Sequence, residues 1–153
     1  MVPEGSPAPD MASFSGPPQP GSGMPRRSGY LPVSEHGLIG DLHTVALVGT
    51  NGTIDWHCSP SFDAPSLFGS ILDADGGGCF ELAAALPATT RQFYLPDTNV
   101  LITRFFAESG VGEIQDFMPV AGAAETGRHR LIRRVVCVRG VMPFRARIAR
   151  KTR

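Results

Sequence analysis

Short runs of apolar residues, or of alternating apolar and polar residues, recur along the chain from residue 38 onward. Gly, Pro, Asn and Asp stand between the runs. This pattern is typical of β-strands joined by tight turns, because side chains on a strand alternate between its two faces. The sequence therefore predicts strands within residues 38–49, 52–58, 78–84, 91–95, 99–106, 111–118, 129–140 and 143–149.

The turn residues predict how neighbouring strands pair. Asn51-Gly52 favours a tight hairpin turn. A turn within residues 108–112 would join the strands on either side of it, and Gly140 and Pro143 would mark a turn between the last two strands. Many short strands of this kind favour a mostly β fold, namely an antiparallel β-sandwich.

Residues 63–73, DAPSLFGSILD, break the alternating pattern. Their apolar residues are spaced by one, three and four positions, Asp63 can accept the first free backbone N–H groups, and Pro65 suits a first helical turn. These features predict one short helix of about two turns. We expect a buried cluster around it, formed by Trp56, Phe62, Leu67, Phe68, Ile71 and Leu72.

Composition changes the interpretation of the N-terminal part. Residues 1–29 hold seven of the 14 prolines and five glycines, with few aliphatic residues. Such a segment buries too little apolar surface to offset the entropy of ordering it, so a disordered tail is expected. Met24 is a plausible alternative start to Met1.

The remaining composition points to a reduced, cytoplasmic setting. No apolar run reaches the ~18 residues of a membrane span, and no secretory signal is visible. The cysteines Cys58, Cys79 and Cys137 are odd in number and widely spaced, so they fit neither a disulfide framework nor a zinc motif. We expect them to be reduced and buried.

A formal net charge of zero hides an uneven distribution of charge. Residues 30–127 hold twelve acidic and two basic side chains, whereas residues 128–153 hold ten basic side chains and no acidic one. A basic tail favours nucleic acid as one hypothesis. The alternative, which we prefer, is that the arginines up to Arg139 meet acidic groups of the same domain or of a partner, and that residues 145–153 are a frayed end.

Asp55, Trp56 and Asp63 are the candidate site residues. Two carboxylates can act as general acid and base in glycoside hydrolysis, and a Trp ring can stack on a sugar. The structural alternative is that Asp55 ends a strand, Asp63 caps the expected helix and Trp56 lies in the core. We prefer this alternative and regard the three as at most adjacent to a substrate.

No metal or cofactor is expected from the sequence. His57 and Cys58 are adjacent, so on a strand they point to opposite faces. His36 and His43 lie seven positions apart with no cysteine at zinc spacing. The glycines at 76–78 lack the Lys-Ser/Thr of a phosphate-binding loop, so we expect a tight turn there.

The order of several motifs resembles the N-terminal, trehalase-like domain of bacterial glycoside hydrolase family 15, which includes glucoamylase-like and trehalase-like enzymes. The resemblance covers residues 30–144. It rests on IGD at 39–41, IDW at 54–56, FD at 62–63, PS at 65–66, YLPDT at 94–98 and DFMP at 116–119. Ser59-Pro60-Ser61 departs from the Leu-Pro-Arg usual before Phe-Asp in the family.

The resemblance implies a β-sandwich that precedes a separate (α/α)6 barrel, which carries two catalytic glutamates. No catalytic residue is therefore expected in this chain, which we interpret as an incomplete sandwich over residues 30–144 without its barrel. The whole enzyme would act on trehalose, maltooligosaccharides or related α-glucosides. A free-standing carbohydrate-binding or interaction module and a nucleic-acid binder remain as alternatives.

Overall fold

The computed structural model describes residues 30–120 and 129–151. In these residues the chain forms ten strands and one short 3-10 helix, η1. The expected N-terminal tail and the choice between Met1 and Met24 lie outside the described residues. The elements are η1 (Val33–Glu35), β1 (His36–Gly40), β2 (Val45–Gly49), β3 (Thr53–Cys58), β4 (Ser66–Phe68), β5 (Cys79–Ala84), β6 (Thr89–Tyr94), β7 (Leu101–Ala107), β8 (Gly110–Phe117), β9 (Ile132–Gly140) and β10 (Phe144–Ala149).

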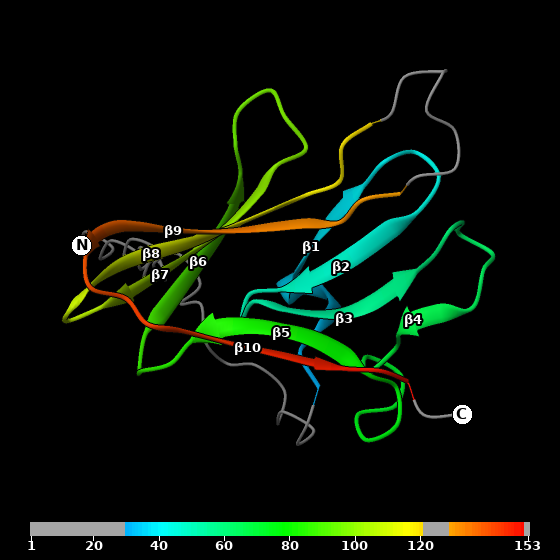
Figure 1. Cartoon of the computed structure of the whole chain (residues 1–153), viewed down its shortest axis with the longest axis horizontal. Coiled ribbons are helices and arrows are strands. Elements are labelled where there is room, and N and C mark those ends of the chain that lie inside the picture. The colour runs from blue at the N-terminus through cyan, green and yellow to red at the C-terminus, as the bar shows by residue number, and fades with distance from the viewer. Residues whose placement is uncertain (1–29, 121–128, 152–153) are drawn as a thin grey trace, which may run out of the picture.

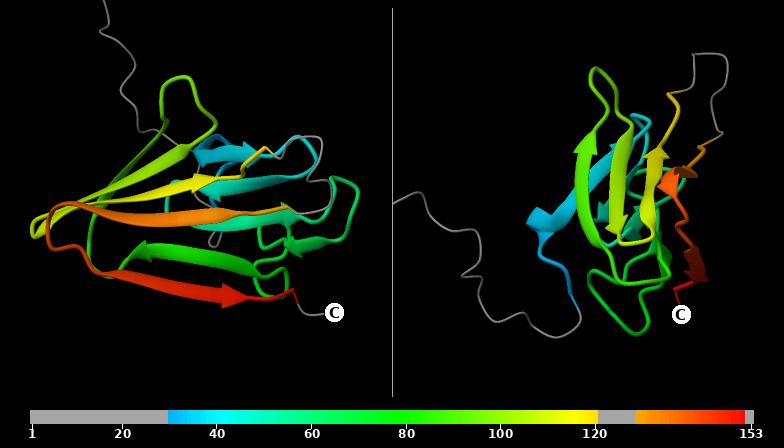
Figure 2. Two further views of the ribbon diagram at one scale, coloured as in Figure 1. Left: turned by 45° about the horizontal axis from the view of Figure 1, so that its top comes forward. Right: turned by 90° about the vertical axis from the view of Figure 1, so that its left-hand side faces the viewer.

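The strands form two antiparallel sheets (Figures 1 and 2). One sheet has the order β1-β2-β3-β5-β10, with β4 also paired to β3, and the other has the order β6-β7-β8-β9. Every pairing between these strands is antiparallel. The prediction of a mostly β, antiparallel fold is confirmed.

The core lies between the two sheets. One buried cluster joins β1, β2 and β3 to the second sheet, and its members are Ile39, Ala46, Val48, Ile54, Leu101 and Met118. A second cluster joins β5 to β7 and β8 and contains Leu82, Phe105, Ile114 and Met142. Burial of each large apolar side chain stabilises the fold by about 1.5–3 kcal/mol, so these clusters hold the sheets together.

The turn between β2 and β3 forms as Asn51-Gly52 predicts. The Gly52 backbone N–H donates to the Gly49 carbonyl at 2.8 Å, and the Asn51 side-chain oxygen accepts from the Thr53 N–H at 2.9 Å. Gly52 has a φ of 83°, in the left-handed region that suits glycine. A Cβ at this position would also overlap the Leu82 carbonyl oxygen.

The short helix predicted within 63–73 is wrong. Residues 66–68 instead form β4, which pairs with β3 through His57–Phe68 and Cys58–Ser66. After β4 the chain turns, with the Gly69 N–H donating to the Gly77 carbonyl at 2.7 Å and the Gly77 N–H donating to the Asp73 carbonyl at 2.8 Å. Pairing with a neighbouring strand has overridden the local helical spacing. The glycines at 76–78 lie in and just after this turn, as expected.

The apolar cluster expected around that helix is also largely wrong. Phe62, Leu67 and Leu72 are exposed, Leu72 to 73%. Trp56, Phe68 and Ile71 are partly buried, and Phe68 packs at the edge of the first core cluster. Without a helix, no apolar surface within residues 30–120 and 129–151 covers Phe62, Leu67 and Leu72, so they contribute little to the core.

The two last strands do not pair with each other, contrary to the prediction. β9 pairs with β8, whereas β10 pairs with β5 in the other sheet. The chain crosses from one sheet to the other through residues 141–143, and Met142 is buried at this crossing. The strand β10 also corrects the expectation that residues 145–153 form a frayed end, at least as far as Ala149.

Two arginines of β10 face an acidic side chain on β5. Arg145 and Arg147 each contact Glu81, at 2.6 Å and 3.1 Å. The hydrogen bond from Arg145, supported by Arg147, holds the pKa of Glu81 below its usual value, although partial burial opposes this shift. These two positive charges therefore neutralise an acid of the same domain.

Arg133 links the two sheets from the inside. Its guanidinium donates to both carboxylate oxygens of Asp116, at 2.8 Å and 3.1 Å. It also donates to the backbone carbonyls of Phe80 and Gly52, at 2.8 Å and 2.7 Å. Asp116 is fully buried, and the Arg133 side chain is 3% exposed. The expectation that an arginine before residue 140 meets an acid of the same domain is confirmed for Arg133.

Cys58 and Cys79 are buried and free, as expected, but Cys137 is exposed. Cys137 lies on β9, which is an edge strand, so one side of its backbone has no neighbour to cover it. Among the described residues, no helix is long and apolar enough to cross a membrane.

Candidate functional site

Three of the motif segments meet at one end of the sandwich, which we call the motif end. It comprises the β1–β2 turn (41–44), the β6–β7 loop (95–100) and residues 118–120. The Tyr94 hydroxyl donates to the Leu38 carbonyl at 2.8 Å and accepts from the Leu38 backbone N–H at 2.9 Å. The Asn99 amide donates to the carbonyls of Gly40 and Met118, at 3.1 Å and 3.4 Å. These bonds fix the three segments relative to one another.

Asp41 organises the β1–β2 turn. One carboxylate oxygen accepts the backbone N–H groups of His43 and Thr44, at 3.0 Å and 2.9 Å. Leu42, between Asp41 and His43, has a φ of 75°, a conformation that non-glycine residues rarely adopt. Burial tends to raise the pKa of Asp41, but the hydrogen bonds from His129, Thr44 and His43 outweigh it and lower that pKa. Asp41 is therefore an anion at neutral pH.

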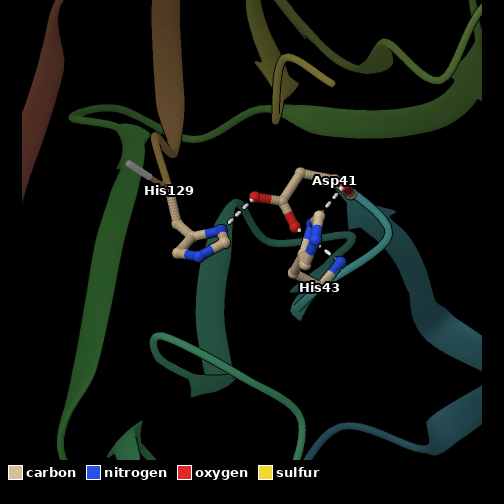
Figure 3. A group of neighbouring side chains, drawn as sticks. All are labelled: Asp41, His43 and His129. Atoms are coloured by element: carbon tan, nitrogen blue, oxygen red, sulfur yellow. Dashed lines mark hydrogen bonds and ion pairs between the residues drawn. The ribbon is translucent and has the colours of Figure 1, made fainter. Parts of the chain in front are cut away.

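Two histidines lie beside this carboxylate (Figure 3). His129, which comes before β9, places its Nδ1 2.6 Å from the second carboxylate oxygen of Asp41. The ring centroids of His43 and His129 are 5.4 Å apart. Asp41 is buried, the His129 side chain is 14% exposed and His43 is exposed. The group thus has a buried anion and an open outer side, and it is the only set of side chains in the described residues arranged to hold a metal.

Exposed apolar side chains surround the motif end. Leu42 is 79% exposed, and Phe62, whose N–H donates to the His43 carbonyl at 3.1 Å, is 57% exposed. Leu95 in the β6–β7 loop and Val120 beyond β8 are exposed as well. An exposed group of this kind on a small domain is typical of a surface that contacts another protein part.

Asp55, the first of the sequence candidates, lies in the middle of β3 rather than at its end. It is buried, and one of its oxygens is 2.7 Å from His36 Nε2. Its other oxygen has no hydrogen-bond partner. Asp55, Asn51, Thr53 and Arg147 help to line a small cleft of about 180 Å³. His36 therefore pairs with Asp55 and not with His43.

The other two candidates do not join Asp55 in one site. Trp56 follows Asp55 on β3 at an irregularity in the pairing with β2, where Leu47 pairs with Trp56 and Val48 pairs with Ile54, so Asp55 is the extra residue of a β-bulge. Asp63 is exposed and accepts a hydrogen bond from the Ser61 hydroxyl at 2.6 Å, which lowers its pKa. In the described residues, no hydrogen bond or ion pair connects these three side chains. Asp63 caps no helix, since none forms there.

The buried carboxylates of the described residues are each matched to a histidine or an arginine. Asp41 meets His129, Asp55 meets His36, Glu113 meets Arg104 and Asp116 meets Arg133. Glycoside hydrolysis needs two carboxyl groups that face one substrate from opposite sides. These four carboxylates are instead arranged as separate pairs that stabilise the fold.

Comparison with known families matches residues 28–148 to the family described as trehalase-like, N-terminal. The chain belongs to this family. The match spans both sheets and almost all of the described strands. The trehalase-like domain thus includes the motif end, the Asp41 turn and the Arg133–Asp116 pair.

Curated relatives with sequence similarity are trehalases. A trehalase from Thermoplasma volcanium is 41% identical over 97 residues, which is 60% of this chain and 15% of the relative. A trehalase from Mycolicibacterium smegmatis is 30% identical over 139 residues, which is 79% of this chain and 20% of the relative. The chain thus matches a fifth or less of the length of these two relatives. No solved structure matches this trehalase-like domain.

Sequence reasoning missed two features of the site. It did not pair His36 with Asp55, which are 19 positions apart, or His129 with Asp41, which are 88 apart. No spacing rule connects residues so distant in the chain. One signal was available in the sequence: Asp41 is a charged residue within the IGD motif on which the resemblance rests.

The partial burial of Trp56 leads to a prediction. We expect Trp56→Ala to lower the free energy of unfolding by about 2 kcal/mol, less than the ~3–5 kcal/mol typical of a fully buried aromatic residue. Urea unfolding followed by circular dichroism measures this change. An unchanged stability together with the loss of sugar binding would instead make Trp56 a ligand contact.

Proposed function

We propose that this chain is a non-catalytic β-domain that supports the catalytic domain of a trehalase-related enzyme of glycoside hydrolase family 15. The family match over residues 28–148 supports this proposal most directly. The carboxylates of the domain are consistent with it, because the buried ones are held in pairs with histidine or arginine. The catalytic acid and base would belong to the separate (α/α)6 barrel.

The substrate of the whole enzyme, on this proposal, is an α-linked glucoside. The relatives described above carry the name trehalase, which favours trehalose over maltooligosaccharides. In the barrel, one carboxyl group would protonate the leaving oxygen while a second activates a water molecule. The β-domain would contribute a rigid surface and no reacting group.

The motif end is the surface that we assign to the contact with the barrel. It joins three of the motif segments and exposes Leu42, Phe62, Leu95 and Val120. Covering these side chains would remove apolar surface from water, at about 25 cal/mol for each Å² covered. The bonds made by Tyr94 and Asn99 would keep this surface in shape before the barrel docks.

We expect the purified chain to release no glucose from trehalose, maltose or starch, because the reacting carboxyl pair is missing from its described residues. Glucose release is measured with a coupled assay, and the M. smegmatis trehalase serves as the positive control. Hydrolysis by the chain that disappears in Asp55→Asn would overturn the non-catalytic role. Binding of trehalose that disappears in Trp56→Ala would instead support a free-standing carbohydrate-binding module.

The supporting role itself can be tested with a chimera. The segment of the M. smegmatis trehalase that matches this chain is deleted, or replaced by residues 30–151 of the chain. We expect the deletion to abolish trehalose hydrolysis and the replacement to restore it at least in part. A deleted enzyme that stays fully active would contradict the proposal.

Three arginines of the basic C-terminal part contact acidic groups of the same domain, which disfavours a nucleic-acid function. Arg133 is buried against Asp116, and Arg145 and Arg147 contact Glu81. Arginines held by carboxylates in this way are poorly placed to neutralise phosphates.

A further inference from the structure

We propose that Asp41, His43 and His129 form a binding site for a divalent transition-metal ion, for which Zn²⁺ is the natural probe. Each of the three offers one ligand atom, and these atoms all lie within 4.8 Å of one another. Around a tetrahedral zinc ion with bonds of about 2.1 Å, neighbouring ligand atoms are separated by roughly 3.4 Å. Small side-chain rotations bring the three atoms to that spacing.

The carboxylate is already oriented for this role. The oxygen of Asp41 that accepts the N–H groups of His43 and Thr44 is held by the backbone, so the other oxygen points at His129. Ligands of protein metal sites are typically fixed by such additional hydrogen bonds. The left-handed conformation of Leu42 returns the chain so that His43 lies beside the same carboxylate.

The set of ligand atoms selects the class of metal. Two imidazole nitrogens and one carboxylate oxygen suit Zn²⁺, Co²⁺ and Ni²⁺, whereas Mg²⁺ and Ca²⁺ prefer ligands that are all oxygen. The ion would take the place of the proton that His129 Nδ1 shares with Asp41, and this imidazole would then carry its proton on Nε2. Three protein ligands leave one position for water on the exposed side, next to His43.

Zinc binding would cross-link two segments of the fold. Asp41 and His43 belong to the β1–β2 turn, and His129 precedes β9 in the other sheet. The metal would therefore connect two segments that are 88 positions apart and fix the start of β9 against the motif end. This role is independent of the proposed contact with a catalytic barrel.

The test is calorimetric titration of Zn²⁺ into chain that carries no affinity tag and has been treated with a chelator. We expect one ion per chain and a higher melting temperature with zinc, as follows when a ligand binds only the folded state. Mg²⁺ should produce neither effect. His43→Ala is the most informative variant, since the exposed His43 ring contributes little to folding. His43→Ala, His129→Ala and Asp41→Asn should each weaken binding at least about tenfold.

Two control variants separate this site from adventitious binding. Cys137→Ala removes an exposed thiol, a type of group that zinc also accepts as a ligand, and Asp63→Asn removes an exposed carboxylate outside the cluster. Both should bind zinc like the unmodified chain. Asp41→Asn keeps a side-chain oxygen that can accept the His43 and Thr44 N–H groups of the β1–β2 turn. Weaker zinc binding by this variant would therefore report a lost ligand and not an unfolded chain. The proposal is overturned if zinc fails to saturate one site, or if His43→Ala and His129→Ala bind zinc as tightly as the unmodified chain.

Discussion

Replacing Arg133 with methionine is expected to lower the free energy of unfolding by about 3–5 kcal/mol, as when one partner of a buried ion pair is removed. The change leaves the fully buried Asp116 without its cation, and it leaves the Phe80 and Gly52 carbonyls without a side-chain donor. Urea unfolding measures the loss. As a matched control, Arg145→Met should cost less than about 1 kcal/mol, because Arg145 is largely exposed and Arg147 still meets Glu81.

The pH dependence of the Arg133→Met variant identifies the cause of its instability. Burial raises the pKa of Asp116, and Arg133 counteracts this rise in the unmodified chain. Without Arg133 the pKa of Asp116 in the folded state lies still further above its value in the unfolded state. The variant therefore loses more folding free energy as pH rises from the unfolded-state pKa to the folded-state pKa of Asp116. The difference in stability between variant and unmodified chain should therefore shrink in acid. An equal difference at pH 5 and pH 7.5 would assign the loss to packing and not to charge.

Gly52→Ala is expected to cost about 2–4 kcal/mol, which combines the strain of a left-handed alanine with the overlap of its Cβ and the Leu82 carbonyl. The Gly52 carbonyl also accepts from Arg133 and from the Leu82 N–H, so a shift of this turn disturbs both sheets. Thermal unfolding and urea unfolding should agree on the loss.

Gly69→Ala provides the comparison for this variant. Its φ lies outside the left-handed region, and the nearest atom to a Cβ there is the Ser66 hydroxyl at 3.3 Å, which can rotate away. We expect a change within about 1 kcal/mol. If both glycine variants were equally stable, the β2–β3 turn would not depend on a left-handed residue.

The features that sequence reasoning predicted correctly depend on neighbours in the chain. Asn51-Gly52 forms its turn through bonds with Gly49 and Thr53, all within a few positions. The alternating run from Leu101 to Phe105 forms β7 and supplies both core clusters. Such features can be predicted from a short stretch of sequence, because the alternation of a strand and the residue preferences of a turn depend only on nearby residues.

The features that it missed depend on partners far away in the chain. Asp63 and Pro65 carry the local signals of a helix start, but the residues after them pair with β3 instead. The two last strands look like a hairpin around Gly140, yet the open edges of different sheets accept them. The cluster of Asp41, His43 and His129 needs the complete fold to bring its third member into place. These strand pairings and side-chain contacts cannot be predicted from residue spacing or from composition.

The division of β9 and β10 between the two sheets has a consequence for the order of events during translation. Each of these two strands forms one edge of its sheet, and among the described strands of this domain they are synthesised last. Until Arg133 emerges, Asp116 has no cation to accompany it into the core, and until Phe144–Ala149 emerges, Glu81 has neither of its arginines. The nascent chain should therefore delay its final collapse until synthesis has passed β10, with exposed strand edges that are available to chaperones in the meantime.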